Sequence, residues 1–530
     1  MNPLIQLSTA SNPLLVRNTF LPTILAVAIL VLAPIAAHAD SATWGLDPIS
    51  GDWNTASNWT PLEVPNGPAD IATFGLSQTT IVSISANTEV NGITFTPAAT
   101  NPYIITASPG LTLTISGIGI TNNSGTTQNF VTAVAANGEV GQIFFTNSAT
   151  AADGTFINNG GLAGVFGDGG FTRFAFGSTA ANGTFINNGG AVSGARGGFT
   201  ELISGTAADG TFVNNGGAVS GADGGFTRFH FDSTAGAATL IANGGTDGGQ
   251  GGTIFFMGDS TGGTSLVEVF GNGSLDISAH NAGDVPVGSI EGDGNVFLGA
   301  KSLSVGSNNV STMFSGVIQD GGINGGVGGS LTKTGTGALT LSGANTYTGD
   351  TNINGGVLKV NGSITSNTFA NSGGTLAGTG TVQGNVTNTG GTVSPGDSPG
   401  TLTVTGNYTQ TQFATLMIQI AGMSAGQFSV LDVTGTANLD GTLHPVLLDG
   451  FIPTIGQTFT FLDYASLTGE FSGIENQVFN NGTEGWSVTY ESTFAVLTAV
   501  AVVPGVPDQA STLLLLTLSL LGLVTYRQKC

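Results

Sequence analysis

The sequence predicts an all-β fold of the parallel β-helix (solenoid) type, in which successive coils of one chain stack on each other. The first observation is a repeat of 27 to 29 residues, because a fixed period in this range is typical of solenoids. The second is that apolar and polar residues alternate within each repeat, as half-buried strands require. The third is a glycine-rich composition, 86 of 530 residues, with few charged residues. The repeats open at Gly141, Gly170, Gly198, Gly225 and Gly252.

Each repeat is expected to form one coil with two short strands joined by turns. In the first strand, Phe174 and Phe176 are expected to point into the core. Phe229 and Phe231 repeat this pattern two copies later. The second strand ends in an Asn-Asn-Gly-Gly turn, since asparagine and glycine tolerate positive φ. This second strand begins at Thr155, Thr184 and Thr211.

Stacking such coils predicts columns of equivalent side chains at steps of ~4.8 Å. An asparagine column is expected at one corner, its amides hydrogen-bonded along the stack as in cross-β ladders. A column of alternating charge, Arg173, Glu201 and Arg228, is expected on the outer face, because each residue follows its repeat glycine by three positions. The interior column is Phe174, Leu202, Phe229 and Phe256, and the asparagine column is Asn159, Asn188, Asn215 and Asn243.

Composition excludes several classes of partner. The formal net charge is −23 with only nine Lys and Arg residues, so nucleic acid and anionic lipid are not expected partners. The single cysteine, Cys530, is the last residue, and no intramolecular disulfide is expected. No cofactor is expected either.

Residues 1–39 are expected to form a signal peptide that contains an apolar helix. Arg17 is its only Lys, Arg, Asp or Glu residue, and the run 21–37 is apolar. Ala37 and Ala39 flank a small-x-small cleavage site before Asp40. A retained membrane anchor is the alternative, which Pro22 and Pro34 disfavour. The sequence therefore predicts export.

Residues 40–140 are expected to form an N-terminal cap and the first coils. A solenoid needs a cover over its first coil, and three clustered tryptophans supply the bulk for one. The alternative is a sugar-stacking platform made of the same three rings. Residues 53–59 read W-N-x-A-x-N-W and residues 64–74 read V-P-N-x-x-x-D-x-A-x-F, which resembles the start of many bacterial surface β-helix proteins. The tryptophans are Trp44, Trp53 and Trp59.

Three further segments complete the predicted body of the protein. Residues 141–273 carry the repeat, and residues 274–330 form less regular coils that end in a glycine-rich run, 321–330, predicted to be a soft joint. Residues 331–503 are expected to form the distal part. There, the stretch 331–359 resembles the autotransporter-associated β-strand repeat, L-x-K-x-G-x-G-x-L-x-L-x-G-x-N-x-Y-x-G. That resemblance implies a right-handed parallel β-helix of the passenger type.

Residues 504–530 resemble a sorting tail of the PEP-CTERM type, in its V-P-D variant. An apolar run, 513–524, follows the motif and is expected to form a short helix, ahead of Arg527 and Lys529. The two basic residues would hold the end of that helix on the cytoplasmic side. The resemblance implies a transient membrane anchor that sorting machinery removes. Lipidation of Cys530 is the alternative, although no lipidation motif surrounds it. The motif residues are Val506, Pro507, Asp508, Ser511 and Thr512.

Two motifs or residue groups are typical of enzymes. The G-x-S-x-G motif of serine hydrolases occurs around Ser260 and Ser398, but no helix is expected after either serine. Polysaccharide lyases share the β-helix scaffold and use acidic Ca²⁺ clusters with a basic residue, and turn carboxylates such as Asp168, Asp209 and Asp223 are candidate ligands. Neither reading gives a complete set of catalytic or metal-binding residues.

The sequence thus predicts an exported, non-enzymatic β-solenoid of the cell surface, outer membrane or extracellular matrix. Adhesion and association with surface polysaccharide are the roles left open. Its expected partners are the export and sorting machinery and, transiently, the membrane. The alternative function is that of a carbohydrate-active enzyme, similar to a polysaccharide lyase, on the same scaffold.

Overall fold

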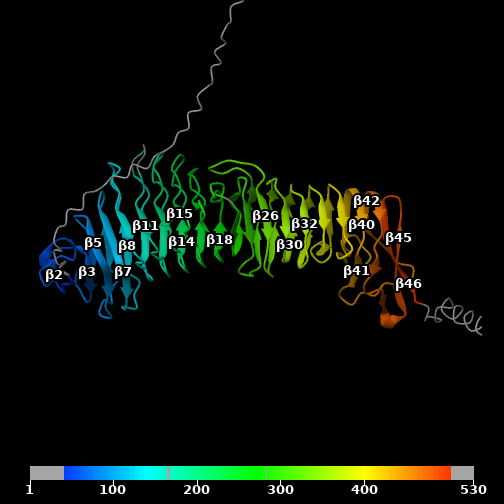
Figure 1. The fold of residues 1–530 in the computed structure, drawn as a ribbon, viewed down its shortest axis with the longest axis horizontal. Helices are drawn as coiled ribbons and strands as arrows, with labels where there is room; N and C mark the ends of the chain where they lie inside the picture. The colour runs from blue at the N-terminus through cyan, green and yellow to red at the C-terminus, as the bar shows by residue number, and fades with distance from the viewer. Residues whose placement is uncertain (1–40, 163, 165–167, 282, 503–530) are drawn as a thin grey trace, which may run out of the picture. The chain divides into compact units, whose positions relative to one another are not determined.

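The computed structural model describes residues 41–162, 164, 168–281 and 283–502. Within these residues the fold is all-β, and its strands pair almost entirely in parallel, as in Figure 1. The helical elements there are two three-residue 3-10 turns, η1 (Ala56–Asn58) and η2 (Asn480–Gly482). The prediction of an all-β stack of parallel strands is therefore confirmed. The handedness of the coil stays a prediction.

The strands form three sheets that run along the stack, each sheet adding one strand per coil. The first sheet has the order β2 (Trp59–Thr60), β1 (Ala42–Trp44), β3 (Gly67–Phe74), β5 (Thr88–Phe95), β7 (Thr112–Asn122), β9 (Gln142–Phe145), β11 (Phe171–Ala175), β13 (Phe199–Ile203), β15 (Phe226–His230), β17 (Thr253–Phe256), β19 (Ser274–Asp276), β22 (Asn295–Phe297) and β25 (Val317–Gln319).

The second sheet follows the pairings β4 (Ile81–Ser83), β6 (Ile104–Ala107), β8 (Asn129–Thr132), β10 (Thr155–Asn158), β12 (Thr184–Asn187), β14 (Thr211–Asn214), β16 (Thr239–Ala242), β18 (Leu266–Val269), β21 (Ser289–Gly292), β24 (Thr312–Phe314), β27 (Ala338–Leu341), β30 (Gly356–Val360), β33 (Gly374–Gly378), β36 (Thr392–Pro395), β39 (Thr415–Ile420), β41 (Thr442–Leu447) and β43 (Gly473–Ile474).

The third sheet belongs to the distal coils, where the long strand β40 (Val430–Leu439) joins two ladders. One ladder is β20 (Asp284–Val287), β23 (Ser302–Val305), β26 (Ser330–Lys333), β29 (Thr351–Ile353), β32 (Thr368–Ala370), β35 (Val386–Asn388) and β38 (Tyr408–Gln410). The other is β28 (Ala344–Asn345), β31 (Ser363–Ile364), β34 (Thr381–Val382) and β37 (Thr401–Val404). The antiparallel strands β46 (Phe494–Ala501), β45 (Glu484–Tyr490) and β44 (Val478–Phe479) follow β42 (Thr458–Gly469), which pairs with β40.

The repeat coils have a third contact that the two-strand expectation omits. Between the strands of the first and second sheets, a threonine of each coil pairs with the equivalent threonine of the next, for example Thr179 with Thr206. The Thr179 hydroxyl accepts a hydrogen bond from the amide of Ala181 at 3.1 Å, which fixes the turn. One-residue bridges are too short for the sequence pattern to show. The bridging residues are Thr150, Thr179, Thr206, Thr234 and Thr261.

The interior of the repeat coils is made of stacked aromatic columns. Phe174, Leu202, Phe229 and Phe256 are paired in register on the first sheet and fully buried, so the predicted interior column is confirmed. On the second sheet the rings of Phe156 and Phe185 stack at 4.8 Å. Burial of a phenylalanine side chain contributes about 1.5–3 kcal/mol, and each coil adds at least one such side chain or a leucine.

The expectation that Phe176 and Phe231 point inward is wrong. Strand β11 ends at Ala175, and Phe176 has a φ of 55° with a side chain 75% exposed. Phe231 has a φ of 53° and is 61% exposed. This left-handed residue turns the chain out of the strand, so the alternation of inward and outward side chains ends one residue earlier than the sequence pattern indicates.

The three tryptophans are buried inside the first coil. Trp44, Trp53 and Trp59 are at most 2% exposed, and the ring of Trp59 lies 5.0 Å from that of Trp44 and 5.1 Å from that of Trp53. The indole of Trp53 donates to the carbonyl of Pro65 at 3.0 Å. Because rings this deeply buried present no face to solvent, the alternative of a sugar-stacking platform at these residues is wrong.

The glycine-rich run 321–330 is hydrogen-bonded to side chains of an earlier coil. Asp276 accepts a hydrogen bond from the Ile323 amide at 2.7 Å, and Ser278 accepts one from the Asn324 amide at 3.0 Å. The stack continues past this point, because β24 pairs with β27. The predicted soft joint is thus a loop beside two ladders that continue, β23 with β26 and β24 with β27, whereas the first sheet ends at β25 just before it.

The predicted terminal signals lie outside the described residues. These are the segment 1–39 with its cleavage site at Ala37 and Ala39, and the segment 504–530 with its sorting motif and basic end. Among the residues that the structure does describe, no helix is both long and apolar enough to cross a membrane.

Candidate functional site

The charged column of the repeat coils lies on the outer face of the first sheet. Glu201 on β13 is in register with Arg173 on β11 and with Arg228 on β15. Its carboxylate lies 2.9 Å from Arg173 Nε and 3.6 Å from Arg228 Nη1. The Glu201 side chain is only 9% exposed, whereas the two arginines are about a third exposed. The structure therefore places one carboxylate between two guanidinium groups, one coil above and one coil below.

His230 completes this cluster on the outer face. Its Nε2 lies 3.7 Å from Glu201 Oε1. Burial lowers the pKa of His230, Glu201 acts in the opposite direction, and Arg228 lowers it further. Because the net shift is downward, the neutral imidazole is favoured, and Glu201 is shared mainly by the two arginines.

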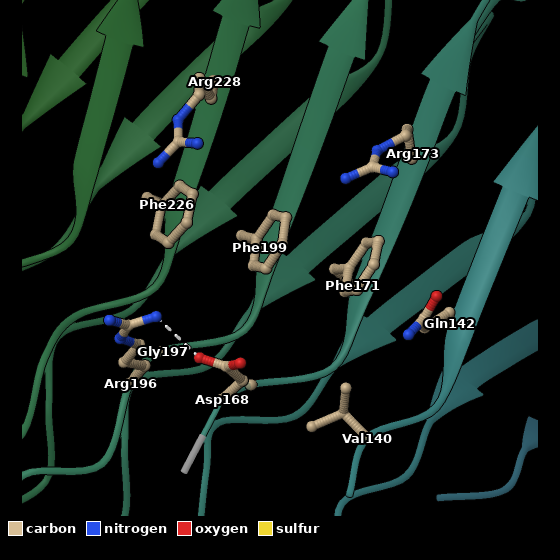
Figure 2. Close-up of a pocket in the computed structure, with 11 residues that line it drawn as sticks. Val140, Gln142, Asp168, Phe171, Arg173, Arg196, Gly197, Phe199, Phe226 and Arg228 are labelled. Atoms are coloured by element: carbon tan, nitrogen blue, oxygen red, sulfur yellow. Dashed lines mark hydrogen bonds and ion pairs between the residues drawn. The ribbon is translucent and has the colours of Figure 1, made fainter. Parts of the chain in front are cut away.

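A row of half-buried phenylalanines runs beside the charged column, two residues before it in each strand. Phe171, Phe199 and Phe226 stack with centroid distances of 4.6 and 4.7 Å and interplanar angles of 7° and 4°. Figure 2 shows the three rings in line across the strands, with Arg173 and Arg228 beyond them. The guanidinium of Arg173 lies 5.1 Å from the Phe171 centroid, and that of Arg228 lies 4.8 Å from the Phe226 centroid. Cation–π contacts of this kind hold the arginines over the rings.

The far wall of the groove is made of loop residues and backbone. Arg196 and Asp168 form an exposed ion pair at 2.9 Å, visible in Figure 2. Gly197 and Gly224 lie where neighbouring coils approach closely, since a Cβ on Gly197 would be 2.1 Å from the Gly224 carbonyl oxygen. Only glycine fits there, and the backbone of successive coils forms a continuous edge to the groove.

Two adjoining cavities make up this groove, which we call the phenyl–guanidinium groove. Their volumes are about 300 and 470 Å³. They share a short set of residues and together extend from β9 to β17. The shared residues are Arg196, Gly197, Phe226 and Arg228.

The groove concentrates the scarce positive charge of the protein. The arginines among the described residues are Arg173, Arg196 and Arg228, and all three line it. Their charge is balanced locally by Glu201, Asp168 and Asp223, which gives three positive and three negative groups. The groove is thus close to neutral in a strongly acidic protein, and it offers hydrogen-bond donors and acceptors side by side.

Two asparagine ladders lie at the corner after the second-sheet strands. The expected ladder is half-exposed: Asn215 donates to Asn188 at 3.0 Å, and Asn243 donates to Asn215 at 3.0 Å. Asn188 lies 3.5 Å from Asn159. A second ladder, which the sequence reasoning missed, is fully buried one residue earlier. Its members are Asn158, Asn187 and Asn214.

The buried ladder is fully hydrogen-bonded at its centre. Asn187 Oδ1 accepts from Asn158 at 2.8 Å and from the Thr200 hydroxyl at 2.9 Å. Its Nδ2 donates to Asn214 at 2.8 Å and to the Thr227 hydroxyl at 3.2 Å. All four hydrogen bonds available to an asparagine side chain are therefore made inside the core.

The serine and metal candidates do not form a catalytic arrangement. Ser260 is 2% exposed, and its carbonyl, not its hydroxyl, lies 2.8 Å from His280 Nε2. Ser398 is exposed in a turn after which β37 begins, so no helix follows it. In the part of the chain that the structure describes, no group of three or more His, Cys, Asp or Glu side chains is placed to hold a metal ion. The turn residue Asp168 pairs with Arg196 instead.

The signals for the missed residues were present in the sequence. Side chains two residues apart in a strand point to the same face of the sheet. The outer charged column follows Phe171, Phe199 and Phe226 by two residues in each strand, so this spacing places the three rings on the outer face. Asn187 follows the buried Phe185 by two residues in β12, so the same spacing places Asn187 in the core.

Comparisons with known proteins identify one segment of the chain. The family described as Passenger-associated-transport-repeat matches residues 331–360, which run from β26 to β30. The fold and this segment define the class of the protein: a stack of parallel β-coils that contains a passenger-type repeat.

Matches to whole proteins are short or distant. Two extracellular serine proteases of Serratia marcescens are 53% identical to the chain over 49 residues, which is 9% of this chain and 5% of each protease. The crystal structure of the Haemophilus influenzae Hap adhesin is 12% identical, with a TM-score of 0.26 over 81% of this chain and 64% of that one. The chain thus spans about a twentieth of the curated relatives that it matches.

Proposed function

We propose that the protein is an exported, non-enzymatic β-solenoid that acts at the cell surface or in the extracellular matrix as an adhesive element. The observation that carries this proposal is the passenger-type repeat at 331–360, which is folded as an integral part of the coil stack. The name of the matched Serratia marcescens proteins includes the word extracellular, which agrees with export. The right-handed coil implied by the passenger resemblance is part of the same proposal.

The terminal segments supply the route to the surface in this proposal. The signal peptide is removed after Ala39, and the segment 504–530 holds the protein transiently in the membrane until sorting machinery cleaves it. Mass spectrometry of the surface form tests this, because the mature protein should begin near Asp40 and lack Arg527 and Lys529. Intact peptides from Met1 or Cys530 in that form would contradict it.

The adhesive role predicts a dependence on the phenyl–guanidinium groove. Cells that express the full chain should attach to a surface or to each other more strongly than cells that lack it. A chain with Phe199→Leu and Arg228→Gln should be exported equally well but should not support attachment. Attachment that is unchanged in this variant would move the adhesive surface elsewhere. A lyase-like enzyme would instead release unsaturated sugar products from polysaccharide, and we expect none.

A further inference from the structure

The phenyl–guanidinium groove repeats the same subsite from coil to coil. At each step it offers a phenyl ring on the outer face and glycine backbone on the opposite side. Phe171 with Gly169, Phe199 with Gly197, and Phe226 with Gly224 are equivalent pairs. A surface built from equivalent subsites in a line fits a ligand that is itself a linear repeat.

The step between subsites distinguishes between kinds of polymer. Strands of successive coils lie ~4.8 Å apart, and the ring spacings of 4.6 and 4.7 Å follow that step. An extended peptide rises ~3.3 Å per residue and falls out of phase with the coils after one step. A pyranose unit in an extended polysaccharide is close to one coil in length, so one sugar can occupy each subsite.

The chemistry of the groove favours a hydroxyl-rich, uncharged ligand. The three stacked rings are half-buried, so each presents apolar C–H surface to the groove, against which the C–H groups of a sugar can pack. The adjacent Arg173–Glu201 and Arg196–Asp168 pairs present donors and acceptors together, as vicinal hydroxyls require.

Electrostatics argues against a polyanion at the same place. The positive groups of the groove are already neutralised by three carboxylates, and the whole chain carries a formal charge of −23. An anionic chain would be repelled by the remainder of the protein without a compensating positive groove.

We propose that the phenyl–guanidinium groove binds a linear, uncharged polysaccharide that lies across β9 to β17, with one sugar residue per coil. This inference rests on the proposed adhesive function and specifies its ligand. It assigns Phe171, Phe199 and Phe226 to the sugar-contacting floor. Arg173, Glu201 and Arg228 are assigned to hydroxyl recognition along one edge.

Binding to defined glycans tests the proposal on the purified mature chain. The probes are soluble β-1,3-glucan, β-1,4-glucan, β-1,4-mannan and α-1,6-glucan oligosaccharides of two to seven sugars, with alginate and hyaluronan as anionic probes. We expect at least one uncharged series to bind, with affinity that rises with length and levels off near five sugars. The dissociation constant should change by less than about twofold between 0.05 and 0.5 M salt, because no net charge is neutralised.

Variants locate the site and separate binding from folding. Phe199→Leu and Arg228→Gln should each weaken binding about tenfold, the equivalent of ~1.4 kcal/mol. Phe369→Leu is the matched control, because Phe369 is a half-exposed phenylalanine on β32, outside the groove, and it should bind normally. Circular dichroism and thermal melting of each variant verify that the coil stack is intact.

The outcomes distinguish this inference from the proposed function. Absence of binding to all four uncharged series, or binding to the anionic probes alone with a steep salt dependence, overturns the ligand assignment. Equal weakening by Phe369→Leu and Phe199→Leu overturns the site. If the groove variants still abolish cell attachment in either case, the adhesive function stands and only its ligand is wrong. Failure of export or attachment in the unmodified chain overturns the proposed function itself.

Discussion

Removal of the buried amide at Asn187 should cost far more stability than removal of the half-exposed amide of its neighbour Asn188. Asn187→Ala breaks four buried hydrogen bonds of 2.8 to 3.2 Å. At about 1 kcal/mol for each hydrogen bond, the expected loss is ~4 kcal/mol. Asn188→Ala removes one hydrogen bond of 3.0 Å and one of 3.5 Å at a half-exposed site, and water can replace both. Its expected cost is below ~1 kcal/mol.

The assay should read the coils around β12 and β14, because each coil of a repeat protein is coupled mainly to its neighbours. Hydrogen exchange of the amides of 184–187 and 211–214 reports their local opening. A loss of ~4 kcal/mol corresponds to exchange about a thousandfold faster, against less than about tenfold for Asn188→Ala. Thermal melting of both variants provides a second measurement. Equal effects of the two substitutions would refute the reasoning that burial and full hydrogen bonding make the inner ladder the stabilising one.

Three further predictions concern charge. Glu201→Arg should destabilise the repeat coils by ~1 kcal/mol relative to Glu201→Gln, because the arginine sets three like charges in register. This difference in stability should be larger at 0.01 M than at 1 M salt. Glu201→Gln should also lower the pKa of His230 further, as an NMR titration would show, because Glu201 raises that pKa in the wild type. Glu268 pairs in register with Glu291, and burial and then Glu291 raise its pKa above 4.5, so its ionisation opposes folding. Glu268→Gln should therefore increase the free energy of unfolding at pH 7 by ~0.2–1 kcal/mol, which a higher melting temperature would show. This gain in stability should vanish below pH 4.5, where the wild-type carboxyl is protonated in both states. Burial lowers the pKa of Lys333 to about 8 from 10.5, so the stability of the wild type should increase as the pH rises from about 8 to 10.5, and Lys333→Met should flatten that increase in denaturant melts.

The sequence predicts this fold well because each coil repeats the same local information. The register of Phe174 with Leu202 and of Glu201 with Arg228 follows from aligning the repeat glycines, since equivalent positions of a parallel stack must pair. The alignment carries no information about the single-residue bridges at Thr179 and Thr206, because a one-residue contact has no periodicity. It also gave the wrong side for Phe176, where a left-handed residue ends the strand.

The candidate groove was only half predictable for a related reason. The column Arg173, Glu201, Arg228 was expected from charge signs at one repeat position. The ring column beside it was not, because a phenylalanine in a β-solenoid is expected inside, and Phe171, Phe199 and Phe226 are outside. The rings lie outside because they precede the outer charged column by two residues in each strand. The intervening residues, which point inward and are buried, are Thr172, Thr200 and Thr227.

Those buried threonines connect the groove to the inner ladder. The Thr200 hydroxyl donates to Asn187 in the core, while of its neighbours in β13 Phe199 lines the groove and Glu201 binds the arginines of the outer face. The position of a ring on the outer face is thus fixed by a hydrogen bond on the inner face, one residue away. Because the same connection recurs at Thr172 and Thr227, the polar core holds consecutive subsites in one register. The repeating ligand that we propose for the groove depends on that register, because its units must meet equivalent subsites at equal steps.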